Sequence, residues 1–171
     1  ALLGGASFVG GTIFGLSPFW SGVALGAPAI GYAVGNYLSG RFSVRFGINR
    51  MAMIGTLITF FGMSTSVILT LLGVHHPLNF FGFCVFIGLG NGLALPNVMA
   101  GSVSVLPHLA GTASGLGGAI MVGGGAALSQ LAGSLLGPAS GTLPLQILMW
   151  TVSALAILSI LFVIWRENRL A

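Results

Sequence analysis

Few side chains of this 171-residue chain have the chemistry for catalysis or for metal binding. They comprise three histidines, one cysteine and one acid: His75, His76, His108, Cys84 and Glu167. A catalytic triad needs an acid that orients its histidine, and the single acid stands in the C-terminal tail, far from every histidine in the sequence. The adjacent histidines have no third metal ligand nearby. We therefore expect no enzyme, no metal site and no cofactor.

The elements that carry these residues are strongly apolar. Hydrophobic residues make up 56% of the chain and charged residues only 4%, whereas a soluble domain carries about 25% charged residues. Most of the outer surface must therefore face lipid. The five cations are all arginines and fall in two short islands. A nucleic-acid-binding protein spreads Lys and Arg over a surface, so we expect no nucleic-acid partner.

Six apolar segments read as membrane spans, at about residues 1–14, 18–39, 51–74, 78–105, 109–136 and 144–165. They are too long for strands and lack the alternation of a membrane barrel. Helices satisfy their own backbone groups, as lipid demands. The chain begins inside an apolar stretch, so we expect the first helix to be truncated. The predicted fold is an all-α membrane protein, a bundle of six transmembrane helices.

Small and polar residues predict how the spans pack. The fourth and fifth spans are rich in glycine and should be interior, whereas the sixth has none and should face lipid. Pro28 and Pro96 lie inside spans and should kink their helices. A buried amide either bonds a neighbouring helix or lines a water-filled cavity, and both interpretations stay open here. The candidate cavity-lining residues are Asn36, Asn91, Asn97, Met99 and Gln130.

The arginines predict the orientation. Arg41, Arg45 and Arg50 stand between the second and third spans, and Arg166 and Arg169 stand in the tail. Four spans separate the two islands, an even number, so both fall on one side of the membrane. The positive-inside rule makes that side, and with it the C-terminus, cytoplasmic.

The first arginine island carries a spaced motif of glycines and basic residues. Its matching positions are Gly35, Arg41, Arg45, Gly47 and Arg50. The motif resembles the cytoplasmic loop signature of the major facilitator superfamily, with Gly40 where the family has an acid. A second run, from Pro107 to Ser114, resembles the Ala-Gly-Thr-Ala-Ser region of the Bcr/CflA multidrug efflux branch. The alternative interpretation is that these arginines only anchor the chain at the cytoplasmic face of the membrane, as the positive-inside rule predicts.

The resemblance implies that the chain is the C-terminal six-helix half of a twelve-helix transporter in the bacterial cytoplasmic (inner) membrane. The family couples efflux of amphipathic, drug-like molecules to protons by alternating access, and its loop acts as a cytoplasmic gate. No Asp or Glu lies within any span, so the proton-carrying group is expected in the N-terminal half. Two alternatives remain open: an uptake symporter of the same fold, and a non-transporting membrane scaffold subunit.

Overall fold

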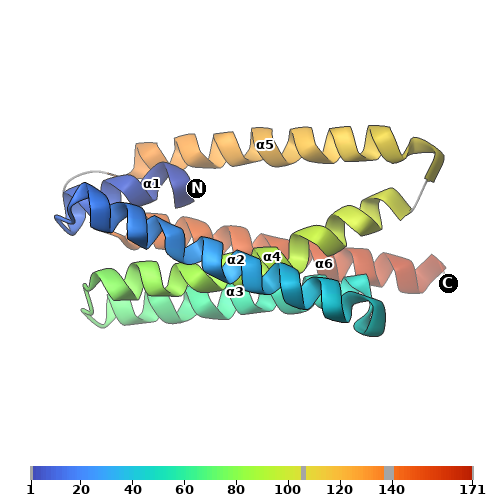
Figure 1. The fold of residues 1–171 in the computed structure, drawn as a ribbon, viewed down its shortest axis with the longest axis horizontal. Helices are drawn as coiled ribbons and strands as arrows, with labels where there is room; N and C mark the ends of the chain where they lie inside the picture. Colours follow the sequence, from blue (N-terminus) through green and yellow to red (C-terminus); the bar gives the residue numbers. More distant parts are fainter. Residues whose placement is uncertain (1, 105–106, 137–140, 171) are drawn as a thin grey trace.

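All regular elements in the described part of the chain, residues 2–104, 107–136 and 141–170 of a computed structural model, are helices. A short α1 (Leu2–Phe8) runs into a π-helical turn, η1 (Val9–Ile13), and a 3₁₀ turn, η2 (Pro107–Leu109), precedes the fifth helix. The five long helices pass back and forth along the bundle (Figure 1). They are α2 (Pro18–Phe46), α3 (Ile48–Leu71), α4 (Pro77–Ser104), α5 (Ala110–Leu135) and α6 (Leu143–Leu170). The all-α prediction is confirmed.

Four of the described helices, α3 to α6, are long and apolar enough to cross a membrane. Their most apolar windows have mean hydropathies between 1.2 and 2.6. The chain is thus a multi-pass membrane protein by the length and composition of these helices. The other two predicted spans do not reach that standard. The α1 helix has 7 residues, and the 29 residues of α2 include many glycines and two prolines, which dilute its apolar side chains.

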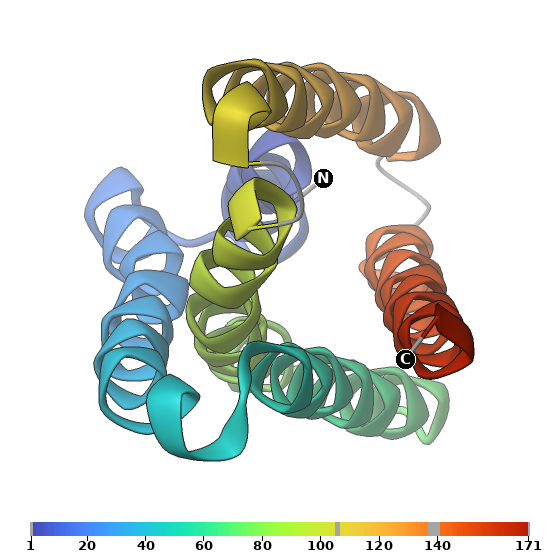
Figure 2. The same cartoon turned by 90° about the vertical axis from the view of Figure 1, so that its right-hand side faces the viewer.

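The α4 helix lies at the centre, between α2 and α3 (Figure 2). Glycines let α2 and α4 approach until backbone meets backbone. A Cβ added to Gly88 would overlap the carbonyl oxygen of Pro28, and one added to Gly31 would overlap a carbonyl oxygen of α4. The same fit repeats one helical turn further on, at Gly35 and Gly92. Close contact through small residues is the usual way in which membrane helices associate.

The opposite face of α4 packs against α3 in a similar way. Gly90 fits against Thr59 and Gly55 of α3, and Gly62 of α3 fits against Phe86. Because these contacts occupy both faces of α4, half of its most apolar window is buried. The prediction that the fourth span is interior is therefore confirmed.

Within the described residues the fifth span is not interior, contrary to the prediction. Only 6% of the most apolar window of α5 is buried, less than the 11% of α6. Apart from Gly117, the glycines of α5, among them Gly111, Gly115 and Gly123, meet nothing within 4 Å. Composition therefore predicted a close-packed face, but the described residues place no neighbour on it. The outward-facing sixth span is confirmed, although the first turns of α6 bury Leu145 and Gln146.

The predicted loop over residues 40–50 is helical instead. The α2 helix continues through Arg41 and Arg45 to Phe46, and α3 begins at Ile48. Gly47 alone separates the two helices, with φ of +87°, a backbone conformation that glycine adopts without a Cβ clash. The predicted end of the fourth span at residue 105 and the connection at 137–140 lie outside the described residues.

The two prolines lie inside their helices as predicted. The α4 helix bends in its C-terminal half, which contains Pro96, and its end rises toward α5 (Figure 1). Proline removes one backbone donor and clashes with the preceding turn, which accounts for a bend there. Pro28 lies within a continuous α2, where its carbonyl oxygen faces Gly88 of α4.

Candidate binding cavity and the arginine end

A cavity of about 630 Å³ lies within the bundle and takes residues from all six α-helices. Its volume falls within the range of roughly 300–1,000 Å³ that holds drug-sized ligands. The wall is mainly aliphatic, with contributions from Leu2, Leu25, Ile87, Leu128, Met149 and Val152. Such a cavity has the size and the apolar lining expected of a small-molecule site.

The cavity lies near the middle of the long helices. The α4 wall runs from Ile87 to Ala94, close to the centre of Pro77–Ser104, and the α3 wall contains Thr56 and Thr59 in a helix that spans Ile48–Leu71. In a bundle whose helices cross a bilayer, this position corresponds to the membrane midplane. Transporters of several folds bind their substrates at that depth.

Three hydroxyl groups of the cavity wall donate hydrogen bonds to backbone carbonyls. Thr56 donates to Met53 O at 2.9 Å. Thr59 Oγ1 donates to Gly55 O, at 3.2 Å. Ser153 Oγ donates to Trp150 O at 2.7 Å. These hydroxyls keep only their lone pairs for a ligand.

The Asn91 side chain differs from these hydroxyls. It lines the cavity and is exposed, and none of the described residues forms a hydrogen bond with its amide. An amide carries two N–H donors and one acceptor oxygen on the same carbonyl carbon. Asn91 therefore presents a complete donor–acceptor pair to whatever fills the cavity.

Of the amides predicted from the sequence, only Asn91 lines this cavity. Asn97 lies between α2 and α4, where it is 3% exposed. Its Nδ2 donates to Ser39 Oγ at 2.8 Å and to Leu93 O at 2.6 Å. Of the two interpretations left open for Asn97, the structure supports the bond between helices. Pro28, predicted only as a kink, lines the cavity as well.

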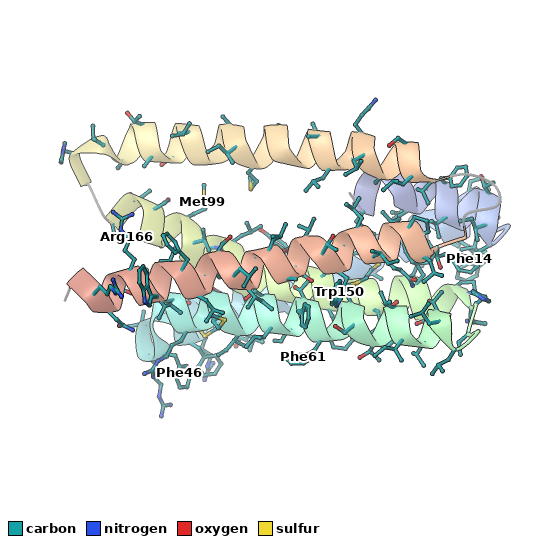
Figure 3. The ribbon with its side chains drawn as sticks, turned by 180° about the vertical axis from the view of Figure 1, so that it is seen from behind. Phe14, Phe46, Phe61, Met99, Trp150 and Arg166 are labelled. Carbon is teal, nitrogen blue, oxygen red and sulfur yellow. The ribbon has the colours of Figure 1, made fainter. Side chains whose placement is uncertain are left out.

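The other three candidate residues lie outside the cavity wall. Asn36 is half-buried on α2, and Gln130 is exposed on α5, so the predicted depth of Gln130 is wrong. The half-buried Met99 side chain points from α4 toward α5 (Figure 3). Its sulfur lies 3.9 Å from the place that a Cβ on Gly117 would occupy.

The structure also contains a set of buried, hydrogen-bonded polar side chains that the sequence did not predict. At the bundle end that holds the α3–α4 turn, Gln146 Nε2 donates to Ser66 Oγ at 3.0 Å, and Ser66 Oγ donates to Asn79 O at 3.0 Å. Asn79 Nδ2 donates to Thr70 Oγ1 at 2.9 Å and to Val74 O at 3.1 Å. The amides of Asn79 and Gln146 thus join the ends of α3, α4 and α6. Both stand near predicted span ends, where a polar residue is ordinary, so the sequence gave no signal of their burial.

The two arginine islands lie at the same end of the bundle. The amide of Asn49, at the start of α3, donates to the carboxylate of Glu167, near the end of α6. Arg166 and Phe46, from the two islands, lie at one end of the molecule in Figure 3. Arg169 stacks over Trp165 at 4.1 Å from the ring centroid, a cation–π contact typical of a membrane interface. The prediction that the islands share one side is confirmed for the fold.

The matched glycines and arginines of the predicted gate do not all lie together. Gly35 is buried against α4, whereas Arg41, Arg45 and Arg50 are exposed at the arginine end. Arg41 Nη1 donates to Tyr37 Oη at 3.4 Å, and the Arg45 guanidinium lies 5.6 Å from the centroid of the Phe46 ring. In the described residues these arginines have only such local contacts.

The histidines lie outside the cavity. His75 and His76 are exposed in the turn between α3 and α4, and His76 Nδ1 accepts a hydrogen bond from the Leu78 backbone N–H at 3.2 Å. His108 is exposed in η2. Across the described ranges, no three His, Cys, Asp or Glu side chains converge as metal ligands would.

The chain matches no protein-family model, and no curated protein or solved structure matches it significantly. The likeness to the major facilitator superfamily therefore rests on the two sequence motifs.

Proposed function

We propose that the chain is part of a secondary active transporter that moves small, drug-like molecules across a membrane by alternating access. The observation that carries the proposal is the cavity of about 630 Å³ at the mid-length of the bundle, with an apolar wall and the unpartnered amide of Asn91. A packed scaffold has no need of such a cavity, because membrane helices gain stability from close van der Waals contact.

The glycine contacts support a moving bundle. Backbone-to-backbone packing of α4 against α2 and α3 makes one rigid unit, whereas α5 is almost entirely uncovered. Alternating access works by rocking one rigid unit against another around a fixed site. In our proposal, the uncovered face of α5 and the cavity mouth meet the N-terminal six-helix half of a twelve-helix protein.

The arginine end indicates how the chain is oriented in the membrane. We place the end with Arg45 and Arg169 in the cytoplasm, with the C-terminus, because cytoplasmic loops carry an excess of arginine. From the resemblance to the Bcr/CflA efflux branch, we take the membrane to be the cytoplasmic membrane of a bacterium. Proton coupling acts through groups of the other half, since none of the described helix residues that line the cavity carries a charge.

A flux measurement tests the proposal. The full-length protein is reconstituted in vesicles, a pH gradient is imposed, and the movement of a neutral and a cationic fluorescent dye is followed with and without an uncoupler. Uncoupler-sensitive flux out of the cytoplasmic side is the expected result. The control is Ser159→Ala, which changes an exposed hydroxyl of α6 outside the cavity and should transport normally.

Each alternative gives a different outcome. Uncoupler-sensitive flux in the opposite direction would identify an uptake symporter of the same fold. The absence of flux for every dye, with the protein shown to be folded, would leave a membrane scaffold and overturn the proposal.

A further inference from the structure

The cavity wall is neutral. The described residues that line it are aliphatic, glycine, proline, hydroxyl-bearing or amide side chains, and none is charged. An ionised group that enters an apolar site without a counter-charge loses its hydration without compensation. The wall therefore disfavours cations and anions alike.

The wall nevertheless offers one amide without a partner. The hydroxyls of Thr56, Thr59 and Ser153 already donate to backbone carbonyls. The Asn91 amide has no partner among the described residues, and neither has the Tyr32 hydroxyl, which is a single atom and cannot present a donor and an acceptor side by side. Asn91 stands on the α4 wall, between Gly90 and Gly92, which pack against α3 and α2. The two flanking glycines hold this stretch of α4 in place, so the amide is held at a fixed height in the cavity.

We propose that the cavity selects neutral, mainly apolar molecules that carry one amide-like group, with a donor and an acceptor side by side, which pairs with Asn91. This inference rests on the proposed function in taking the cavity as the substrate site. Two parallel hydrogen bonds between amides engage one N–H and the carbonyl oxygen of each partner. A molecule that lacks the donor leaves the Asn91 oxygen unpaired in an apolar wall, and a site built around a polar group rejects such molecules.

Binding of four related probes tests the selectivity. The probes share a naphthalene ring: 2-naphthamide, N,N-dimethyl-2-naphthamide, 2-naphthoate and 2-naphthylmethylammonium. Binding is measured by equilibrium dialysis against the full-length protein in lipid nanodiscs, with empty nanodiscs as the correction for partition into lipid. We expect 2-naphthamide to bind about 3- to 10-fold more tightly than its dimethyl analogue, as the loss of one hydrogen bond predicts. The two charged probes should not compete.

Two substitutions assign the selectivity to Asn91. Asn91→Leu should bind both amides equally, whereas the control Gln130→Leu should keep the preference. Asn91→Asp places an anion in the cavity and should gain binding of 2-naphthylmethylammonium, a gain that an unfolded protein cannot produce. Equal binding of both amides by the unsubstituted protein, or a preference that survives in Asn91→Leu, would overturn the inference.

The binding experiment and the flux experiment can fail independently of each other. Amide-selective binding without flux would sustain the inference and remove transport. Flux of the cationic dye in vesicles, together with tight binding of the ammonium probe, would sustain transport and overturn the inference.

Discussion

The side-chain amide of Asn49 donates a hydrogen bond to the carboxylate of Glu167, 118 residues further along the chain. The bond joins the start of α3 to the end of α6, and it engages the single acid of the sequence. Because α3 and α6 are both candidate spans, the contact fixes the α2–α3 connection and the C-terminus on the same side of any membrane that the bundle crosses.

The first prediction concerns this topology. Cysteines placed at Arg45 and Arg169, one at a time in a Cys84→Ala background, should react with a membrane-impermeant maleimide from the same side. Both positions are exposed at one end of the bundle. The measurement compares labelling of intact cells with labelling of inside-out vesicles, and only the vesicles should label.

Cysteine at Val74, which is exposed in the turn at the other end of α3, is the control and should label from the outside. The topology would be refuted by opposite sidedness of positions 45 and 169.

The second prediction concerns the glycine contact at the centre of the bundle. Gly88→Ala should destabilise the protein by about 1–3 kcal/mol, because the new methyl group would overlap the backbone carbonyl of Pro28 and separate two helices. Unfolding by SDS titration, followed by circular dichroism, measures the change.

Gly82→Ala, on the same helix, is the matched control, because a Cβ at Gly82 meets nothing within 4 Å. It should change stability by less than about 0.5 kcal/mol, as surface substitutions usually do. Equal effects of the two substitutions would show that α2 and α4 do not meet at Gly88.

The third prediction separates two buried amides that belong to one group of hydrogen bonds. Asn79→Leu removes every bond that Asn79 Nδ2 donates, including those to Thr70 Oγ1 and Val74 O at the end of α3. Carbonyl and hydroxyl oxygens left unpaired in a buried site cost about 1–3 kcal/mol. The same SDS titration should therefore show a clear loss of stability.

Gln146→Met should cost much less. It removes one bond to Ser66 Oγ, whereas Asn79→Leu removes three, and Ser66 keeps its bond to Asn79 O. Each substitution also removes a buried amide oxygen that has no partner among the described residues, so that gain is common to both. The expected change is within about 1 kcal/mol. A larger loss for Gln146→Met than for Asn79→Leu would contradict the bonds described here.

The sequence predicted the membrane helices and one of the helix contacts for a clear physical reason. Residues four apart lie on one face of a helix, so the spacing of Gly31 and Gly35, and of Gly88 and Gly92, favours close packing on those faces. The structure brings these two pairs together. The same spacing at Gly111 and Gly115 gives a face that meets no neighbour among the described residues. Periodicity identifies a face of a helix but not the helix that covers it.

The candidate site shows the same limit. Asn91 was predicted as one of several amides inside spans, but Gln130 looked alike in sequence and lies exposed on α5. Asn79 and Gln146 were missed because their burial arises where the ends of three helices converge. No local pattern encodes a convergence of segments that lie 67 residues apart in the numbering, from 79 to 146.

The last prediction tests the membrane environment and the cavity together, with two neighbouring residues of α6. Ala156 lines the cavity, and Leu155 is 61% exposed on the outside of the bundle. Successive residues of a helix point about 100° apart, so the two side chains face different surroundings. In a Cys84→Ala background, Ala156→Cys should react readily with a small, water-soluble methanethiosulfonate reagent, because thiols react as thiolates and thiolates need water. Leu155→Cys should react at least about tenfold more slowly, because lipid covers it. If the outer face of α6 were bathed in water, the order would reverse, since Leu155 is the more exposed residue, and both the membrane bundle and the transport proposal would have to be abandoned.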